Sequence, residues 1–227
     1  SFISMGKVFP EGTFVIHSLS AAMGAGGYRL GSCIMPEDCN PEVIQDIAKI
    51  AATVYTSSAT PILEAGIAVY ESGEEMSHYL NAVRNIHRIF TTRLADICRE
   101  NERIKVTVPK AGFYFMVDMN PLTAELQNAG IMHSNDLAPA MIAHPYHVAT
   151  VTGEAMMAPY GDYFIRFAAT DFDGEAALLE YLEKTPQNSR EEEAFFRKFG
   201  SRMIEGIEMY KKWVGDICAG KYRMSPL

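Results

Sequence analysis

Segments with strand periodicity alternate with segments of helical periodicity over most of the 227-residue chain. This alternation constrains the fold more than any other feature, because apolar helix faces and sheet faces must be buried against each other. We therefore predict an α/β fold. Strands are expected at 13–17, 30–35, 105–109, 112–118 and 163–168, and helices at 41–54, 61–100, 135–143 and 174–217, the last broken at 185–188.

The long helical pattern at 61–100 is interrupted near Ser72-Gly73. A glycine inside such a pattern commonly marks a kink or the start of a new structural unit. We place a domain boundary at this point. Residues 1–73 are predicted to form one domain, and residues 74–227 a second, smaller domain with a helical tail.

Charge and composition exclude several classes of function. The net charge of −8, without any basic stripe, argues against a nucleic-acid partner. The chain contains no apolar run long enough to cross a membrane, so we expect a soluble, cytoplasmic protein without a membrane partner. The four cysteines and six histidines show no metal-ligand spacing, which predicts free thiols and no metal site.

A glycine-rich turn follows the first predicted strand, at residues 18–31. It begins with the hydroxyls of Ser18 and Ser20, continues through several glycines, and places Arg29 just before the second predicted strand. Hydroxyls, accessible backbone amides and a guanidinium at a strand end are suited to bind a phosphate dianion. On these features alone, a glycine-rich turn with an ion-paired arginine remains an equal alternative.

The spacing within this turn resembles the S-x-S-K, five residues, G-x-R-x-G motif of class I/II aminotransferases, which have fold type I. Ser18, Ser20 and Arg29 occupy motif positions, as do Gly27 and Gly31. The lysine of the motif falls on Ala21, one residue after Ser20 and eight before Arg29.

Two further segments resemble this family in the same order. Residues 109–115, P-K-A-G-F-Y-F, resemble a strand entry with the pattern P-x-G-G-F-Y, although Ala111 replaces the first glycine. Residues 151–168 resemble the region that ends in G-x-x-x-R, although Thr152 stands where proline is common. The resemblance extends from the start of the chain to about residue 185.

The resemblance implies a cofactor, pyridoxal 5'-phosphate, and roles for individual residues. Ser18 and Arg29, with Ser20 as a weaker candidate, would hold the cofactor phosphate, and Arg166 would pair with the α-carboxylate of the substrate. Ala21 occupies the position of the catalytic lysine, which forms a Schiff base with the cofactor and moves the proton at Cα. The implied activity is transamination between an amino acid and a 2-oxo acid, with this form inactive or trapped.

The resemblance also implies that the chain is the C-terminal half of such an enzyme. Residues 1–73 would then end the large cofactor domain, residues 74–227 would form the small α+β domain, and an N-terminal half would complete the active site. Residues 55–60 resemble a segment that reaches a neighbouring subunit, which implies a homodimer acting in amino acid metabolism.

Several interpretations remain open from the sequence. Ala21 is either a deliberate substitution that traps a bound intermediate or a natural change in a relative that has lost catalysis. The same scaffold also supports elimination and condensation reactions. A catalytically dead protein that binds only the cofactor or another protein is a hypothesis of a different class.

Overall fold

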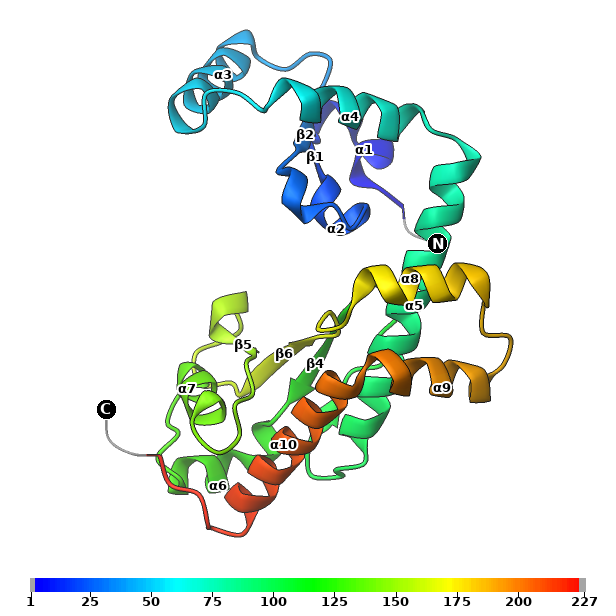
Figure 1. Ribbon diagram of the computed structural model, residues 1–227. Helices are drawn as coiled ribbons and strands as arrows, with labels where there is room; N and C mark the ends of the chain where they lie inside the picture. The colour runs from blue at the N-terminus through cyan, green and yellow to red at the C-terminus, as the bar shows by residue number, and fades with distance from the viewer. Residues whose placement is uncertain (1–2, 225–227) are drawn as a thin grey trace. The chain divides into compact units, whose positions relative to one another are not determined.

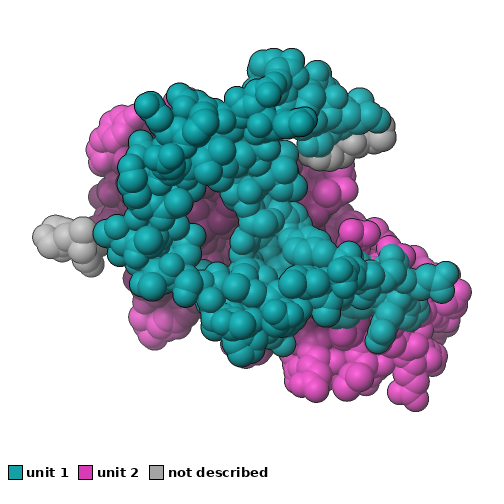
Figure 2. Space-filling view, turned by 90° about the horizontal axis from the view of Figure 1, so that it is seen from above, with its two compact units in different colours: residues 1–80 teal, residues 81–227 magenta. Residues whose placement is uncertain are grey.

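The computed structural model describes residues 3–224 and has a mixed α/β fold (Figure 1). The chain forms two compact units, residues 1–80 and residues 81–227, which are coloured separately in Figure 2. The predicted alternation of strands and helices is confirmed. Among residues 3–224, no helix combines the length and the apolar character required to cross a membrane.

The first unit contains two paired strands and several helices. Strands β1 (Val15–Ser18) and β2 (Gly31–Ile34) pair antiparallel, with Ser18 opposite Gly31. The other elements of this unit are α1 (Met5–Val8), the 3-10 turn η1 (Pro10–Gly12), α2 (Leu19–Ala22), η2 (Gly26–Tyr28), α3 (Pro41–Val54), α4 (Thr60–Glu71) and the start of α5 (Glu74–Arg99).

Helix α3 begins where the sequence predicts. The side chain of Asn40 accepts a hydrogen bond from the backbone N–H of Glu42, and Pro41 occupies the first turn, where its missing N–H costs no hydrogen bond. The apolar face of this helix, however, is largely exposed. Ile50 and Val54 are 62% and 74% exposed, and no residue of α3 is buried.

The second unit is built on a four-stranded antiparallel sheet with the order β3-β4-β6-β5. Its strands are β3 (Lys105–Val106), β4 (Tyr114–Asp118), β5 (Val151–Thr152) and β6 (Phe164–Ala168). Its other elements are η3 (Asn120–Leu122), α6 (Thr123–Asn128), η4 (Ser134–Asp136), α7 (Leu137–Ile142), η5 (Glu154–Met156), α8 (Gly174–Glu183), α9 (Ser189–Phe199) and α10 (Ser201–Cys218).

Two predicted elements differ from the structure in their extent. The strand predicted at 105–109 ends at Val106, because the Thr107 hydroxyl takes the place of a ladder partner and accepts a hydrogen bond from the Met116 N–H. The helical tail is interrupted at Gly200 as well as at 185–188, so that α9 and α10 are separate helices. Strand β5 and helix α6 were not predicted, since each is short and without clear periodicity.

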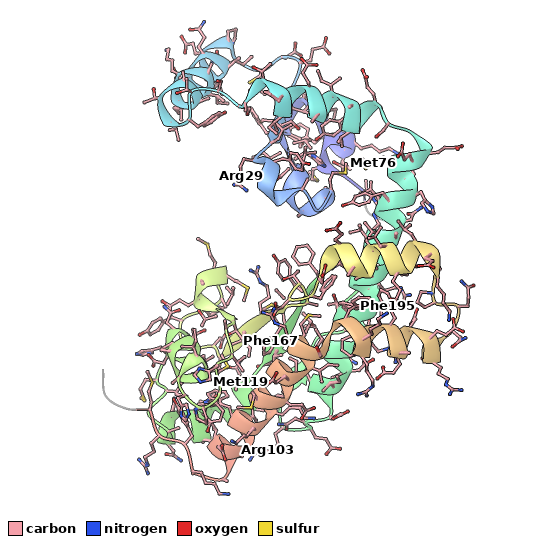
Figure 3. The ribbon with its side chains drawn as sticks, viewed as in Figure 1. Arg29, Met76, Arg103, Met119, Phe167 and Phe195 are labelled. Carbon is pink, nitrogen blue, oxygen red and sulfur yellow. The ribbon has the colours of Figure 1, made fainter. Side chains whose placement is uncertain are left out.

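The hydrophobic core lies almost entirely in the second unit. Phe167 of β6 packs edge-on against Tyr210 of α10, with ring centroids 5.1 Å apart. Phe90 of α5 is fully buried and contacts Phe195 and Phe196 of α9. Figure 3 shows Phe167 and Phe195 among these side chains. Apart from Leu19, the buried hydrophobic residues all lie between Ala82 and Ile217.

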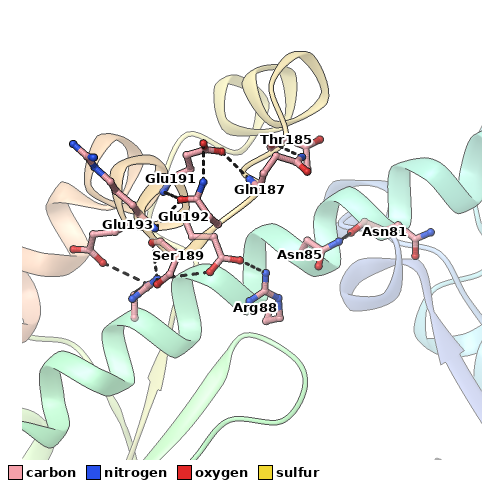
Figure 4. A network of polar contacts seen from close by, with 12 residues as sticks. Asn81, Asn85, Arg88, Thr185, Gln187, Ser189, Glu191, Glu192 and Glu193 are labelled. Atoms are coloured by element: carbon pink, nitrogen blue, oxygen red, sulfur yellow. Dashed lines mark hydrogen bonds and ion pairs between the residues drawn. The ribbon is translucent and has the colours of Figure 1, made fainter.

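A polar network fastens α9 to α5 outside this core (Figure 4). Arg88 forms an ion pair with Glu192, and Arg93 contacts both Glu192 and Glu193. Arg93 also donates hydrogen bonds to the carbonyl and the hydroxyl of Ser189, at 3.0 and 2.8 Å. Glu192 and Glu193 of the acidic run at 191–193 therefore serve this helix contact, whereas Glu191 accepts hydrogen bonds from Gln187 and Asn188 at the start of α9.

Candidate functional site

The glycine-rich turn at residues 18–31 joins β1 to β2 through α2 and η2. Ser18 ends β1 and caps α2, and its hydroxyl oxygen accepts a hydrogen bond from the Ser20 N–H at 3.2 Å. The buried Leu19 anchors the turn, because its N–H donates to the Leu30 carbonyl at 3.1 Å. The Ser18 hydroxyl thus lies at the end of β1, and Ser20 follows it in α2.

Two glycines of the turn are required by the backbone. Gly24 has a φ of +63°, a conformation that residues with a Cβ adopt rarely. A Cβ on Gly31 would lie 2.9 Å from the His17 carbonyl oxygen, so the close approach of β1 and β2 requires glycine at this position. The family motif has glycine at the position of Gly31, and strand pairing explains why.

Arg29 lies at the end of the turn in a left-handed conformation, with a φ of +55°. Its Nη1 donates a hydrogen bond to the Gly26 carbonyl at 2.8 Å, and the residue is exposed (Figure 3). A Cβ on Gly26 would lie 3.9 Å from the Ser20 Cβ, so the Arg29 and Ser20 side chains extend from neighbouring parts of the turn. Within residues 3–224, Arg29 has no carboxylate partner.

These residues fit a phosphate group. The Ser18 hydroxyl uses its oxygen to cap α2, which leaves its hydrogen free to donate. The exposed Arg29 keeps a guanidinium that no carboxylate neutralises within the described part of the chain. The alternative of an ion-paired arginine in a plain turn therefore loses its main support.

Ala21 lies in the middle of α2 and is exposed. A methyl group has no ionisable proton and no nucleophilic atom that could form a covalent bond to a ligand. This part of the turn therefore does not fit the chemistry that a lysine at the same position would supply.

Arg166 lies on β6, on the face of the four-stranded sheet that points away from the core. Side chains alternate between the two faces of a strand, so the buried Ile165 and Phe167 face the core while Arg166 faces outward. Its register partners are Met116 on β4 and Val151 on β5. Arg166 is half-buried, and its Nε is inaccessible and without a hydrogen-bond partner.

The unpaired state of Arg166 distinguishes it from the other half-buried lysines and arginines of residues 3–224. Arg93, Arg99 and Lys211 are also half-buried, and each forms an ion pair with a carboxylate. Arg166 forms no ion pair in the same part of the chain, although burying an uncompensated charge is costly. Such a guanidinium is suited to bind an anion, and its forked geometry matches a carboxylate.

Sequence reasoning assigned no role to Tyr114, which proves to be the closest aromatic neighbour of Arg166. The Arg166 guanidinium carbon lies 4.1 Å from the centroid of the Tyr114 ring. Tyr114 and Arg166 lie on paired strands and on the same face, in diagonal positions. The alternation along 112–118 and 163–168 would have placed both residues on the outer face, but only the strand register makes them neighbours.

Among residues 3–224, no cluster of His, Cys, Asp and Glu is placed to hold a metal ion. The four cysteines are free thiols, and burial raises the pKa of the Cys98 thiol to about 12, so this thiol stays protonated at neutral pH.

The family model and the curated relative that match this chain are both aminotransferases. A family model described as aminotransferase class I and II matches residues 3–177. Aspartate aminotransferase of Sulfurisphaera tokodaii is 24% identical over 173 residues, which cover 74% of this chain and 40% of that protein. The chain therefore spans about two fifths of the length of this curated relative.

Solved structures show the same fold at lower identity. A mutant of Thermus thermophilus aspartate aminotransferase complexed with tryptophan superposes with a TM-score of 0.59 and 23% identity, over 79% of this chain and 42% of that one. A Pyrococcus structure titled protein A1 superposes with a TM-score of 0.60 and 18% identity, over 87% and 45% of the two chains. The mixed α/β fold of this chain is thus that of the C-terminal portion of these proteins.

Proposed function

The chain belongs to the aminotransferase class I and II family, and from this premise we propose that it forms the C-terminal half of a pyridoxal-phosphate-dependent aminotransferase. The observation that carries the proposal is the pair of unneutralised arginines, Arg29 and Arg166, at the two motif positions that bind anions in the family. Arg29 suits a phosphate, and Arg166 suits a carboxylate. A cofactor phosphate and an amino acid substrate together supply both anions.

Ser18, Ser20 and Arg29 would hold the cofactor phosphate. The Ser18 hydroxyl and the Arg29 guanidinium donate hydrogen bonds to phosphate oxygens, and the turn between them offers backbone N–H groups. When bound, pyridoxal phosphate supplies a conjugated ring that withdraws electrons from the substrate Cα. Ser18 and Arg29 anchor the group by its phosphate and leave its reactive end for the substrate.

Arg166 would bind the α-carboxylate of the amino acid and of the 2-oxo acid product. A bidentate guanidinium fixes both the position and the rotation of a carboxylate, and this fixes the direction of the Cα–H bond. The Arg166 guanidinium lies on the Tyr114 ring, and within residues 3–224 no carboxylate forms an ion pair with its two outer nitrogens. Arg166 therefore orients the substrate and takes no part in proton transfer.

Ala21 leaves this form without a group to move the proton at Cα. We propose that a lysine at position 21 completes the enzyme and that the Ala21 form binds its ligands without turnover. Elimination or condensation on the same scaffold remains a second candidate within the family. A dead relative that only binds the cofactor is the candidate from another class, and the exposed methyl of Ala21 is the observation that favours it.

An N-terminal half is proposed as the partner of the first unit. Within residues 3–80, Leu19 is the single buried hydrophobic side chain, and the apolar face of α3 is exposed. Monomeric proteins rarely leave contiguous apolar surface of this kind uncovered.

We refer below to this chain together with such an N-terminal half as the complete protein. Large hydrophobic residues exposed in the first unit include Phe14, Ile16, Ile34, Val43, Ile44, Ile47, Ile50, Val54, Leu63 and Ile67.

The complete protein is expected to be a homodimer with active sites at the subunit interface. Helix α3 ends at Val54 and α4 begins at Thr60, so the segment 55–60 consists of the connection between the two helices and the first residue of α4, and we propose that it reaches the neighbouring subunit. Analytical ultracentrifugation at micromolar concentration is expected to show a dimer. A monomer that binds the cofactor and turns over amino acids would refute this expectation.

Substituting the two arginines separately tests the proposed function. In the complete protein, Arg29→Ala is expected to weaken binding of pyridoxal phosphate, and Arg166→Ala to weaken binding of the amino acid, each by roughly 10- to 100-fold. A hydrogen bond to a charged group contributes roughly 1.5–3 kcal/mol, which corresponds to these factors. Equilibrium dialysis measures both dissociation constants, one for pyridoxal phosphate and one for a labelled amino acid.

Arg190→Ala is the matched control, because Arg190 is exposed and its side chain has no ion-pair partner in residues 3–224. This variant is expected to leave both constants unchanged. If Arg29→Ala bound the cofactor as tightly as Arg190→Ala, the proposed phosphate site would be wrong.

A further inference from the structure

Arg166 has two side chains within reach on β4, and they differ in chemistry. Arg166 is the register partner of Met116, so Tyr114 and Asp118 are its diagonal neighbours on the same face of the sheet. Diagonal Cβ atoms on antiparallel strands are roughly 7–8 Å apart, a span that an arginine side chain crosses easily. The guanidinium could therefore lie on an aromatic ring or pair with a carboxylate.

In the structure Arg166 lies on the ring. Its guanidinium carbon is 4.1 Å from the Tyr114 centroid, within the range of a cation–π interaction. The Asp118 carboxylate instead accepts hydrogen bonds from the N–H and the side-chain amide of Asn120, at 2.9 and 2.8 Å. Asp118, the acidic diagonal neighbour, thus bonds to Asn120 and forms no ion pair with Arg166.

The Tyr114 ring is itself held in place by its neighbours. Phe113 packs against it with ring centroids 4.4 Å apart, and Phe113 in turn contacts His87 of α5 at 5.2 Å. Phe113 and His87 are half-buried, and burial lowers the pKa of His87, which favours an uncharged ring in this stack. The His87 and Phe113 rings therefore support the Tyr114 ring, on which the Arg166 guanidinium lies.

We infer that Tyr114 is a positioning residue that keeps Arg166 off Asp118 and available to a carboxylate ligand. The inference rests on the proposed function of Arg166. It adds that Tyr114 determines whether Arg166 is free to bind a carboxylate. An ion pair with Asp118 would neutralise the Arg166 guanidinium, so that a ligand carboxylate could no longer bind to it. The Tyr114 ring contacts the face of the guanidinium and leaves its edge free. The N–H groups along that edge can therefore still bind a carboxylate bidentately.

Phenylglyoxal, which modifies accessible arginines, tests the inference in the complete protein by mass spectrometry of the Arg166 peptide. Pyruvate is the carboxylate probe, and its half-protecting concentration reports binding. With Tyr114→Leu we expect Arg166 modification to slow and the half-protecting concentration to rise, each by about tenfold, a factor within the range of a cation–π contribution. With Tyr114→Phe, which keeps the ring, both values should stay within about threefold of the parent.

The decisive variant is the double substitution Tyr114→Leu/Asp118→Asn. Asparagine keeps the oxygen that Asn120 requires but removes the charge that would capture Arg166. We expect modification and protection to return to within about threefold of the parent protein. A purely structural defect from losing Tyr114 would not be repaired in this way.

The outcomes separate this inference from the proposed function. If Tyr114→Leu were modified and protected like the parent, or if the double variant stayed impaired, the inference would be overturned. If pyruvate and amino acids failed to protect Arg166 even in the parent, the proposed carboxylate role would fail. The modification rates of the variants would then still decide between the Tyr114 and Asp118 contacts.

Discussion

Replacing Ala21 by lysine in the complete protein is expected to raise the rate of amino acid conversion by about 100- to 10,000-fold, the usual contribution of a positioned acid–base group. Ala21 is exposed in α2, between the Ser18 cap and the turn that carries Arg29, so a longer side chain has room there. A lysine amine can take the proton from the substrate Cα and return it, which a methyl group cannot do.

The measurement is the stoichiometric appearance of 2-oxo acid from a panel of amino acids in the presence of pyridoxal phosphate. Borohydride reduction followed by mass spectrometry adds a readout that does not depend on turnover. It is expected to show the cofactor covalently attached at residue 21 in the lysine variant and absent in the Ala21 form.

Ala22→Lys is the matched control, because Ala22 is also exposed and belongs to the same short helix. Consecutive helical residues differ by about 100° in direction, so a lysine at position 22 points elsewhere. If Ala21→Lys and Ala22→Lys gave the same negligible conversion, the proposal of a lysine-dependent enzyme would lose its support. The alternative of a dead relative would then stand.

Cutting the chain between Gly73 and Glu74 is expected to separate a stable fragment from one that cannot fold alone. The fragment 74–227 keeps α5 whole and contains, of the hydrophobic residues that are buried in the described range 3–224, all except Leu19. This fragment should unfold in urea in one cooperative transition. Residues 1–73 should show none, because hydrophobic burial is the main force that offsets the loss of chain entropy.

Two substitutions control for the source of that stability. Phe90→Ala in the 74–227 fragment should lower the free energy of unfolding by about 3–5 kcal/mol, because Phe90 is fully buried among aromatic rings. Val108→Ala should leave it nearly unchanged, since Val108 is 67% exposed. A cooperative transition of residues 1–73 alone would contradict the proposal that this unit depends on an N-terminal half. So would reversible cooperative unfolding of the entire chain with both units taking part.

The amino-acid sequence by itself determined the order and the type of most elements. Apolar spacing placed α3, α4 and α5, and the Asn40-Pro41 pair located the start of α3, because capping and periodicity are local properties. The resemblance to the family motifs assigned positions to Ser18, Ala21, Arg29 and Arg166. The short elements β5 and α6 were missed, since two to six residues do not establish a period.

Tertiary structure alone decided which of these residues lack partners. Spacing cannot show that Arg166 has no carboxylate beside it, that Asp118 is turned toward Asn120, or that Tyr114 lies beneath the guanidinium. These facts depend on the register between β4 and β6, and a shift of one residue would exchange the two faces of the strand. The exposed apolar face of α3 is a property of the same kind, because periodicity predicts an apolar face but the surrounding structure determines what covers it.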